Sequence, residues 1–198
     1  MKKTNPLRHL YWPFLTARSI ALSKMIAPHI KSSSKILDIG TGNMLIAKSL
    51  KERKDIKVQG LDVIDMNLTN LPHKLFDGEV IPFPNKSFDT SLLIGVLHHV
   101  DKQKKLLKEA MRVTESEIII FEDTYKTNFG KGWLKIRDVV GNIPEEPNMN
   151  FALNFRTVEK WVTLFDELGL EINYNKTFFN PIRLTHHTIF VVSSKTTL

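Results

Sequence analysis

The feature that most constrains the fold is a short apolar strand that runs into two glycines and then into a helix. Residues 35–43 read KILDIGTGN, and a helix is expected to begin near Met44. Glycine lacks a Cβ, so such a turn is tight and a ligand can lie against bare main chain. The helix that follows directs unpaired N–H groups at the same place. This arrangement is typical of folds that bind a nucleotide-like ligand.

The glycine spacing argues against a dinucleotide. A dinucleotide fingerprint has glycine at the first, third and sixth positions of the turn, which here are Gly40, Gly42 and Leu45. The missing third glycine disfavours a nicotinamide-dependent dehydrogenase. Asp38 lies two residues before the first glycine. Its carboxylate would repel a pyrophosphate, and it suits a ligand that carries an ammonium or sulfonium group.

The composition of the chain narrows the possible classes of protein further. A chain of 198 residues is expected to form one domain with a sizeable core. It has no cysteine, which excludes disulfides, thiolate metal sites and a cysteine nucleophile. The formal charge of +7 could attract nucleic acid or an anionic membrane surface. The basic residues are spread along the chain, and we interpret the cluster within 102–108 as a solvated helix face.

No segment predicts insertion into a membrane. No apolar run approaches the ~20 residues needed to cross a bilayer, and charged residues interrupt any signal-peptide core near the N-terminus. We therefore expect a cytoplasmic enzyme without a transmembrane segment.

Strand and helix signals alternate along the first two thirds of the chain. Nearly continuous apolar runs such as 87–96 are typical of strands covered on both faces, so the pattern predicts an α/β fold with a doubly wound parallel sheet. Strands are expected at 36–39, 57–63, within 76–80, and at 87–96, 117–121, 171–178 and 188–193. Helices are expected at 13–29 and 44–53, from a cap at Asp101 through 113, around 133–140, and from a cap at Thr157 to Gly169, with a short helix or turn at 66–71.

Three further segments follow the glycine turn in order. Asp62 ends the second predicted strand, about 20 residues after the turn, where a carboxylate can accept hydrogen bonds from ribose hydroxyls. Residues 77–89 read DGEVIPFPNKSFD, with Asp77 able to accept from an adenine amine and Gly78 allowing the ring to approach. Residues 92–100 read LLIGVLHHV. In this order and spacing, residues 36–123 closely resemble the class I S-adenosylmethionine-dependent methyltransferases, in the branch that includes ubiquinone and menaquinone biosynthesis enzymes.

The resemblance implies a Rossmann-like, seven-stranded sheet, mostly parallel with an antiparallel last strand, and S-adenosyl-L-methionine as cofactor. The chain departs from many members at Met44, where they carry a further glycine. Alternatively, Asp38 only braces the turn, and Asp62 and Asp77 are ordinary strand-end residues. The cofactor-binding residues implied are Asp38, Gly40, Thr41, Gly42, Asp62, Val63, Asp77, Gly78 and Ile94.

One domain spanning 1–198 is expected to have four parts. These are an N-terminal helical cap (1–31), a cofactor-binding core (32–123), a lid or acceptor-binding insertion (124–155), and a closing helix with strands (156–198). The insertion and the cap carry aromatic residues, which favours an apolar acceptor, although such residues often belong to a core.

Candidate catalytic residues lie after the fourth and fifth predicted strands, because ligands of parallel sheets bind at that edge. An oxygen acceptor needs a proton removed, for which we predict His98, His99 and Asp123, with Glu122 and Tyr125 as further candidates. One histidine of the adjacent pair is expected to be structural. Glu122 and Asp123 could equally begin a solvated loop. No metal ligands are predicted.

The sequence does not identify the molecule that accepts the methyl group. A small-molecule or lipid-like acceptor is favoured, because no motif of the Asn-Pro-Pro-Tyr type follows the fourth strand and no RNA-binding module is present. The alternatives are an RNA or protein acceptor, which the positive charge would suit, and a non-catalytic partner subunit, which Met44 keeps open. The sequence does not indicate an oligomeric state.

Overall fold

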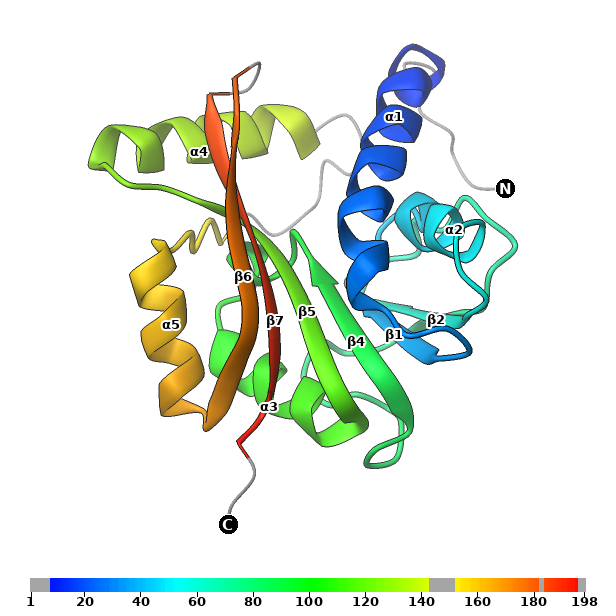
Figure 1. The fold of residues 1–198 in the computed structure, drawn as a ribbon. Helices are drawn as coiled ribbons and strands as arrows, with labels where there is room; N and C mark the ends of the chain where they lie inside the picture. The colour runs from blue at the N-terminus through cyan, green and yellow to red at the C-terminus, as the bar shows by residue number, and fades with distance from the viewer. Residues whose placement is uncertain (1–7, 143–151, 182–183, 196–198) are drawn as a thin grey trace.

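A seven-stranded sheet organises the computed structural model, which describes residues 8–142, 152–181 and 184–195 (Figure 1). The strands are β1 (Lys35–Ile39), β2 (Lys57–Asp62), β3 (His73–Leu75), β4 (Phe88–Ile94), β5 (Thr114–Thr124), β6 (Leu170–Asn180) and β7 (Thr185–Ser194). The α-helices are α1 (Arg8–Ile26), α2 (Leu45–Lys51), α3 (Gln103–Val113), α4 (Asn128–Asn142) and α5 (Val158–Glu167), and η2 (Leu97–His99) is a short 3-10 helix.

The strand order is β3-β2-β1-β4-β5-β7-β6. Every neighbouring pair from β3 to β5 is parallel, and β7 runs antiparallel to both β5 and β6. The predicted Rossmann-like α/β sheet with an antiparallel last strand is therefore confirmed. Among the residues described, no helix has the length and apolar character needed to cross a bilayer.

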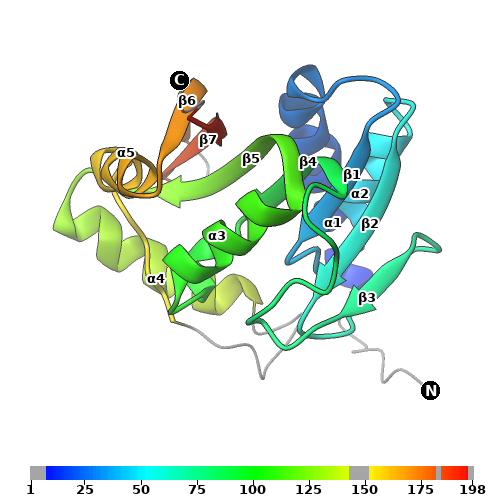
Figure 2. The same ribbon diagram turned by 90° about the horizontal axis from the view of Figure 1, so that it is seen from below.

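Helices cover both faces of the sheet, which explains the continuous apolar runs of the central strands. On one face, Leu107 of α3 and Phe165 of α5 are fully buried against the sheet. On the other face, Ile26 of α1 and Leu50 of α2 are fully buried. Figures 1 and 2 show these two layers of helices with the sheet between them. Burial of apolar area on both faces supplies the main stabilising term of such a fold.

The first helix begins earlier than predicted. It starts at Arg8 rather than Pro13, so the proline lies inside the helix. Proline lacks the N–H that would bond the carbonyl four residues before it. This loss falls near the exposed beginning of α1, whereas Leu15, Leu22 and Ile26 further along are buried.

Two predicted boundaries were wrong. The third strand lies at His73–Leu75, where it pairs with the end of β2, and 76–80 leave the sheet in a turn in which Gly78 has φ +79°. Helix α3 is capped at Lys102 rather than Asp101. The Asp101 carboxylate instead accepts from Asn154 Nδ2 at 3.2 Å, a contact between segments far apart in sequence.

The closing elements agree with the sequence. The Thr157 side chain accepts from the N–H of Lys160 at the start of α5, and Gly169 follows the helix with φ +69°. The helical stretch predicted around 133–140 belongs to α4. Residues 143–151 of the predicted insertion, which include Pro144, Pro147, Met149 and Phe151, lie outside the described residues.

Candidate functional site

The glycine turn is fixed by the tip of the neighbouring strand. The N–H groups of Gly40 and Thr41 both donate to the carbonyl of Leu61, at 2.8 and 3.2 Å. Gly40 has φ +68°, and a Cβ there would lie 2.5 Å from Val96 Cγ2. Gly42 has φ +54°, but a Cβ there would meet nothing within 4 Å. Backbone shape and close packing therefore require the first glycine, whereas a side chain at the second would occupy open space.

Met44 does not obstruct the site. It adopts a left-handed conformation with φ +61°, and its side chain is fully buried in the core between α2 and the sheet. The side chain lies against Gly60 of β2, where a Cβ would be only 2.5 Å from Met44 Cε. Glycine on the strand thus makes room for methionine in the turn.

A cavity of about 830 Å³ extends from the glycine turn across the carboxyl edge of the sheet. Its floor includes Gly42 and Asp62, and its opposite end includes His98, His99 and Asp123. Residues of α1, α4 and β6 also line it, including Phe14, Arg137 and Phe179. The cavity thus brings together the three predicted catalytic residues and the predicted cofactor residues other than Asp38 and Asp77.

Asp38 lies just behind the turn and does not line the cavity. It is buried, and its Oδ2 accepts from Thr41 Oγ1 at 2.6 Å. Burial raises the pKa of Asp38 to about 7, although the Thr41 hydrogen bond opposes the shift. This position supports the alternative that Asp38 braces the turn.

Asp62 is oriented by the backbone around it. Its Oδ2 accepts from the N–H of Gly42 at 2.7 Å, and its Oδ1 accepts from the N–H of Val63 at 2.7 Å. The carboxylate lines the cavity at the tip of β2. It is held where a ligand's hydroxyl groups could reach its remaining lone pairs.

Of the other predicted cofactor residues, only some line the cavity. Val63, Gly78 and Ile94 line the cavity, but Asp77 is exposed and does not. Its Oδ1 accepts from the N–H groups of Glu79 and Val80, and these bonds hold the pKa of Asp77 below its usual value. Asp77 therefore shapes the turn that presents Gly78.

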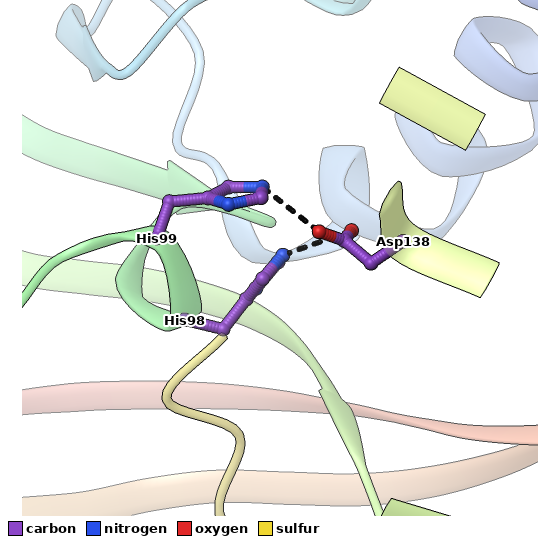
Figure 3. A group of neighbouring side chains, drawn as sticks. All are labelled: His98, His99 and Asp138. Carbon is purple, nitrogen blue, oxygen red and sulfur yellow. Dashed lines mark hydrogen bonds and ion pairs between the residues drawn. The ribbon is translucent and has the colours of Figure 1, made fainter. Parts of the chain in front are cut away.

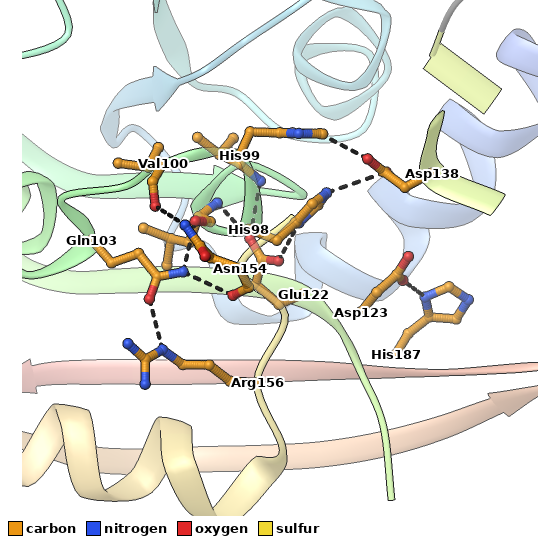
Figure 4. Close-up of polar contacts among 12 residues, drawn as sticks. His98, His99, Val100, Gln103, Glu122, Asp123, Asp138, Asn154, Arg156 and His187 are labelled. Carbon is orange, nitrogen blue, oxygen red and sulfur yellow. Dashed lines mark hydrogen bonds and ion pairs between the residues drawn. The ribbon is translucent and has the colours of Figure 1, made fainter. Parts of the chain in front are cut away.

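His98 is locked between two carboxylates. Its Nδ1 donates to Glu122 Oε2 at 2.6 Å, and its Nε2 lies 3.3 Å from Asp138 Oδ1 (Figures 3 and 4). The ring is buried and stacks on Phe155. Burial disfavours the charged ring, but the two carboxylates outweigh it and raise the pKa of His98 to about 10. This histidine is a fixed cation.

Glu122 is not the start of a solvated loop. Its side chain is fully buried, and its Oε1 accepts from the N–H groups of Val96 and Leu97 at 2.9 and 2.7 Å. The carboxylate thereby anchors η2 to the end of β5, and with it the adjacent histidine pair.

His99 differs from its neighbour in both position and charge. It lines the cavity, and its Nε2 lies 3.6 Å from Asp138 Oδ2 (Figure 3). Burial and the nearby positive charge of His98 lower the pKa of His99 to about 4. The ring is therefore neutral near pH 7.

Asp123 is ion-paired with Arg137 of α4 and His187 of β7. Burial opposes its charge, but the His187 hydrogen bond and the Arg137 charge lower the pKa of Asp123 to about 2. Such a carboxylate is a weak proton acceptor. The two partners and Asp138 were missed in the sequence, although Asp138 is the one acidic residue between 124 and 142, which could have drawn notice.

His98, His99 and Asp138 offer three possible ligand atoms within 4.8 Å of one another. Two histidines and a carboxylate can bind a divalent transition metal. Both ring nitrogens of His98 already face carboxylates, however, and a protonated imidazole has no lone pair for a metal. We interpret the cluster as a hydrogen-bonded network.

Residues 37–121 match the protein family described as "Methyltransferase domain". An uncharacterized protein of Methanocaldococcus jannaschii is 32% identical over 133 residues, covering 63% of this chain and 50% of that protein. The tRNA U34 carboxymethyltransferase of Nautilia profundicola is 30% identical over 104 residues, covering 46% of this chain and 35% of that protein. The chain thus spans half or less of the length of these two relatives.

A third relative is covered more evenly. The demethylmenaquinone methyltransferase of Thermotoga maritima is 25% identical over 172 residues, covering 74% of each chain. Among solved structures, a SAM-dependent methyltransferase from Methanosarcina mazei has a TM-score of 0.64 at 17% identity, covering 86% of this chain and 97% of that chain. The [4+2]-cyclase SpnF has a TM-score of 0.69 at 12% identity, covering 89% of this chain and 80% of that chain. These structures share the fold, which hosts more than one reaction.

The burial of Asp38 predicts a pH-dependent stability. The folded state holds the Asp38 proton up to about pH 7, whereas the unfolded state releases it near pH 4. The unfolded state therefore binds fewer protons between these values, and the residue destabilises the fold as the pH rises. Asp38→Asn, which still accepts from Thr41, should gain up to about 4 kcal/mol over the wild type between pH 4 and 7. Urea unfolding of both proteins across this range measures the difference, and parallel curves would contradict it.

Proposed function

We propose that this chain is a class I S-adenosylmethionine-dependent methyltransferase that transfers a methyl group to a small-molecule or lipid-like acceptor, and the family match over residues 37–121 supports this proposal. The methyl donor carries an activated sulfonium methyl group, so transfer is an in-line displacement that gains chiefly from proximity and orientation. The observation that carries the proposal is a continuous cavity of about 830 Å³ that joins the glycine turn to the histidine pair.

The cofactor end of the cavity fits an adenosyl group. A side chain at Gly42 would fill open space rather than touch protein, so the bare main chain leaves room for a ligand. Asp62 is pre-oriented by the N–H groups of Gly42 and Val63 to accept from ribose hydroxyls. Ile94 and Gly78 also line the cavity, and an apolar side chain and a residue without a Cβ suit contact with an adenine ring.

The acceptor end is largely apolar, with titratable groups on one side. Phe14, Phe121, Phe178 and Phe179 line it from α1 and the sheet. Ligand sites of this kind take their affinity from apolar contact and their orientation from a few polar groups. This lining supports a hydrophobic or aromatic acceptor over a strongly polar one.

We assign different roles to the three predicted catalytic residues. His99 is neutral near pH 7 and lines the cavity, so it is the candidate base of the three, although its lowered pKa of about 4 makes it a weak one. His98, held by Glu122 and Asp138, positions η2 and keeps its neighbour uncharged. Asp123 orients Arg137 and His187 at the cavity wall. His98 and Asp123 are thus positioning residues.

An RNA acceptor is the second candidate. The relatives from Nautilia profundicola and Campylobacter curvus are tRNA U34 carboxymethyltransferases, and this chain is basic. The mainly apolar cover of the cavity favours the first candidate. A non-catalytic subunit is the third; Met44, the departure that kept it open, has its side chain buried in the core and does not line the cavity, which favours the first candidate.

The ribose assignment predicts the behaviour of Asp62→Ala. Loss of the charge-assisted hydrogen bonds should weaken S-adenosylmethionine binding by about 1–3 kcal/mol. Isothermal titration calorimetry measures this, with Asp166→Ala, an exposed carboxylate far from the cavity, as matched control. Unchanged affinity in the Asp62 variant would remove the assignment.

Gly42→Ala should fold but bind the cofactor poorly. The methyl group would enter the cavity, and the left-handed backbone would add about 1–2 kcal/mol of strain. The affinity for S-adenosylmethionine should therefore fall at least about tenfold, with native circular dichroism retained. Gly132→Ala, on exposed α4 with no atom within 4 Å of the added Cβ, is the control. Wild-type affinity of Gly42→Ala would count against the proposed cofactor position.

His99→Gln should lower the rate of methyl transfer to an oxygen acceptor by about 10²–10⁴ and leave cofactor affinity unchanged. Fractionated cell extract supplies acceptors, and mass spectrometry detects the gain of one methyl group. Failure of the wild type to methylate any fraction, despite binding the cofactor, would contradict the proposed activity. Equal rates of the variant and the wild type would contradict the role of His99.

A further inference from the structure

Helix η2 carries the histidine pair, yet it is too short to hold its own position. The N–H of His99 donates to the carbonyl of Val96 at 3.0 Å. The N–H of Val100 donates to the carbonyl of Leu97 at 3.1 Å. A single turn of 3-10 helix forms too few such bonds to offset the entropy of ordering it. Contacts from other elements therefore fix where η2 lies.

The carboxyl end of η2 is held by two amide side chains, as its amino end is held by the buried glutamate of β5. Gln103, the first residue of α3, donates from Nε2 to the carbonyl of Leu97 at 2.8 Å. Asn154 donates through its backbone N–H to the carbonyl of His98 at 2.7 Å. It also donates from Nδ2 to the carbonyl of Val100 at 3.2 Å (Figure 4). Three carbonyls of the turn are thus bonded from outside it.

The Gln103 amide is itself oriented by an arginine. Gln103 is buried, and its Oε1 accepts from Arg156 Nε at 2.6 Å. Because arginine only donates, the amide oxygen must face Arg156, and Nε2 must face the carbonyls of Leu97 and Asn154. The guanidinium carbon of Arg156 lies 5.5 Å from the ring centroid of Trp161, a fully buried residue of α5. The hold on η2 therefore extends back to the core.

Residues 154–156 reach the histidine pair in three ways. Asn154 bonds the backbone of η2, and Arg156 acts through Gln103. Between them, the buried Phe155 stacks on the His98 ring with 4.5 Å between the ring centroids. Neither Gln103 nor residues 154–156 line the cavity. Any influence that they have on the cavity thus passes through η2.

We propose that Gln103 is a positioning residue for methyl transfer, because it fixes the carboxyl end of η2 and thereby the directions of the two histidine rings. Successive side chains of a 3-10 helix are about 120° apart. A rotation of η2 would therefore carry His98 away from its two carboxylates and His99 away from the cavity wall. Only the link to methyl transfer rests on the proposed function, whereas the hold on η2 rests on the contacts alone.

The test of the hold is amide hydrogen exchange of the full chain, followed by NMR without cofactor. Gln103→Glu keeps the size of the side chain and an acceptor for Arg156, but a carboxylate cannot donate to the carbonyls. The amides of His99 and Val100, which close η2, should exchange at least about tenfold faster in this variant. Amides of β1 and α2 should keep their wild-type rates.

Gln59→Glu is the matched control. Gln59 is a partly buried glutamine of β2 whose Nε2 donates to the carbonyl of Gly60 at 2.8 Å, and it does not line the cavity. The same change of charge at this position should leave the exchange of η2 at the wild-type rate.

The link to the reaction is measured separately. Calorimetry should give the Gln103→Glu variant the wild-type affinity for S-adenosylmethionine, because Gln103 lies outside the cavity. Methyl transfer to an oxygen acceptor should fall about 10- to 100-fold in kcat, with the KM for the cofactor unchanged, because a displaced group loses its orientation toward the acceptor.

Three results would overturn the positioning role. They are wild-type exchange of η2 in a folded Gln103→Glu protein, exchange that rises by the same factor in every element, which would indicate a loss of global stability only, and faster exchange of η2 with wild-type kcat. If circular dichroism shows that Gln103→Glu does not fold, Asn154→Ala, which removes the Nδ2 donor at a partly exposed position, is compared in the same way. A wild type that transfers no methyl group would contradict the proposed function, and the exchange rates would still decide whether Gln103 holds η2.

Discussion

The hydrogen bonds between the tips of β1 and β2 are the interaction on which the site depends. The Leu61 carbonyl accepts two N–H groups of the glycine turn, and the Asp62 carboxylate accepts a third from Gly42. These bonds join two parallel strands at the edge where the loops of the sheet converge. The same contacts that close the turn therefore also aim the carboxylate at the cavity. Fold and site share one set of interactions here.

At the other end of the cavity, ion pairs between buried side chains hold the site together, where backbone hydrogen bonds do so at the glycine turn. Glu122 and Asp138 hold His98 from opposite sides, while Arg137 and His187 hold Asp123. A buried charge is costly unless it is paired, and the pairing supplies each of the three carboxylates with partners. A neutral His99 beside a charged His98 follows from this arrangement rather than from any property of histidine itself.

Local signals in the sequence predicted the sheet, the glycine turn and the Thr157 cap, because each depends on neighbours a few residues away. They could not predict which distant segments meet. Asp138 reaches the site only because α4 folds over the edge of the sheet, and His187 reaches it because β7 pairs with β5 and places His187 opposite Asp123. The third strand was misplaced for a similar reason, since its position is set by pairing with β2 rather than by its own pattern.

The Met44 side chain fills the space that a side chain at Gly60 would need, and this should limit how the two positions vary among relatives. A methionine in the turn is tolerated because the facing strand residue has no side chain. A lineage with glycine at the turn loses the clash with methionine, and a Cβ on the strand would then need only Thr41 Cγ2, 3.0 Å away, to shift, whereas a lineage that keeps methionine has no room for that Cβ. The two positions should covary, and the pair would mark a subgroup of chains with this core.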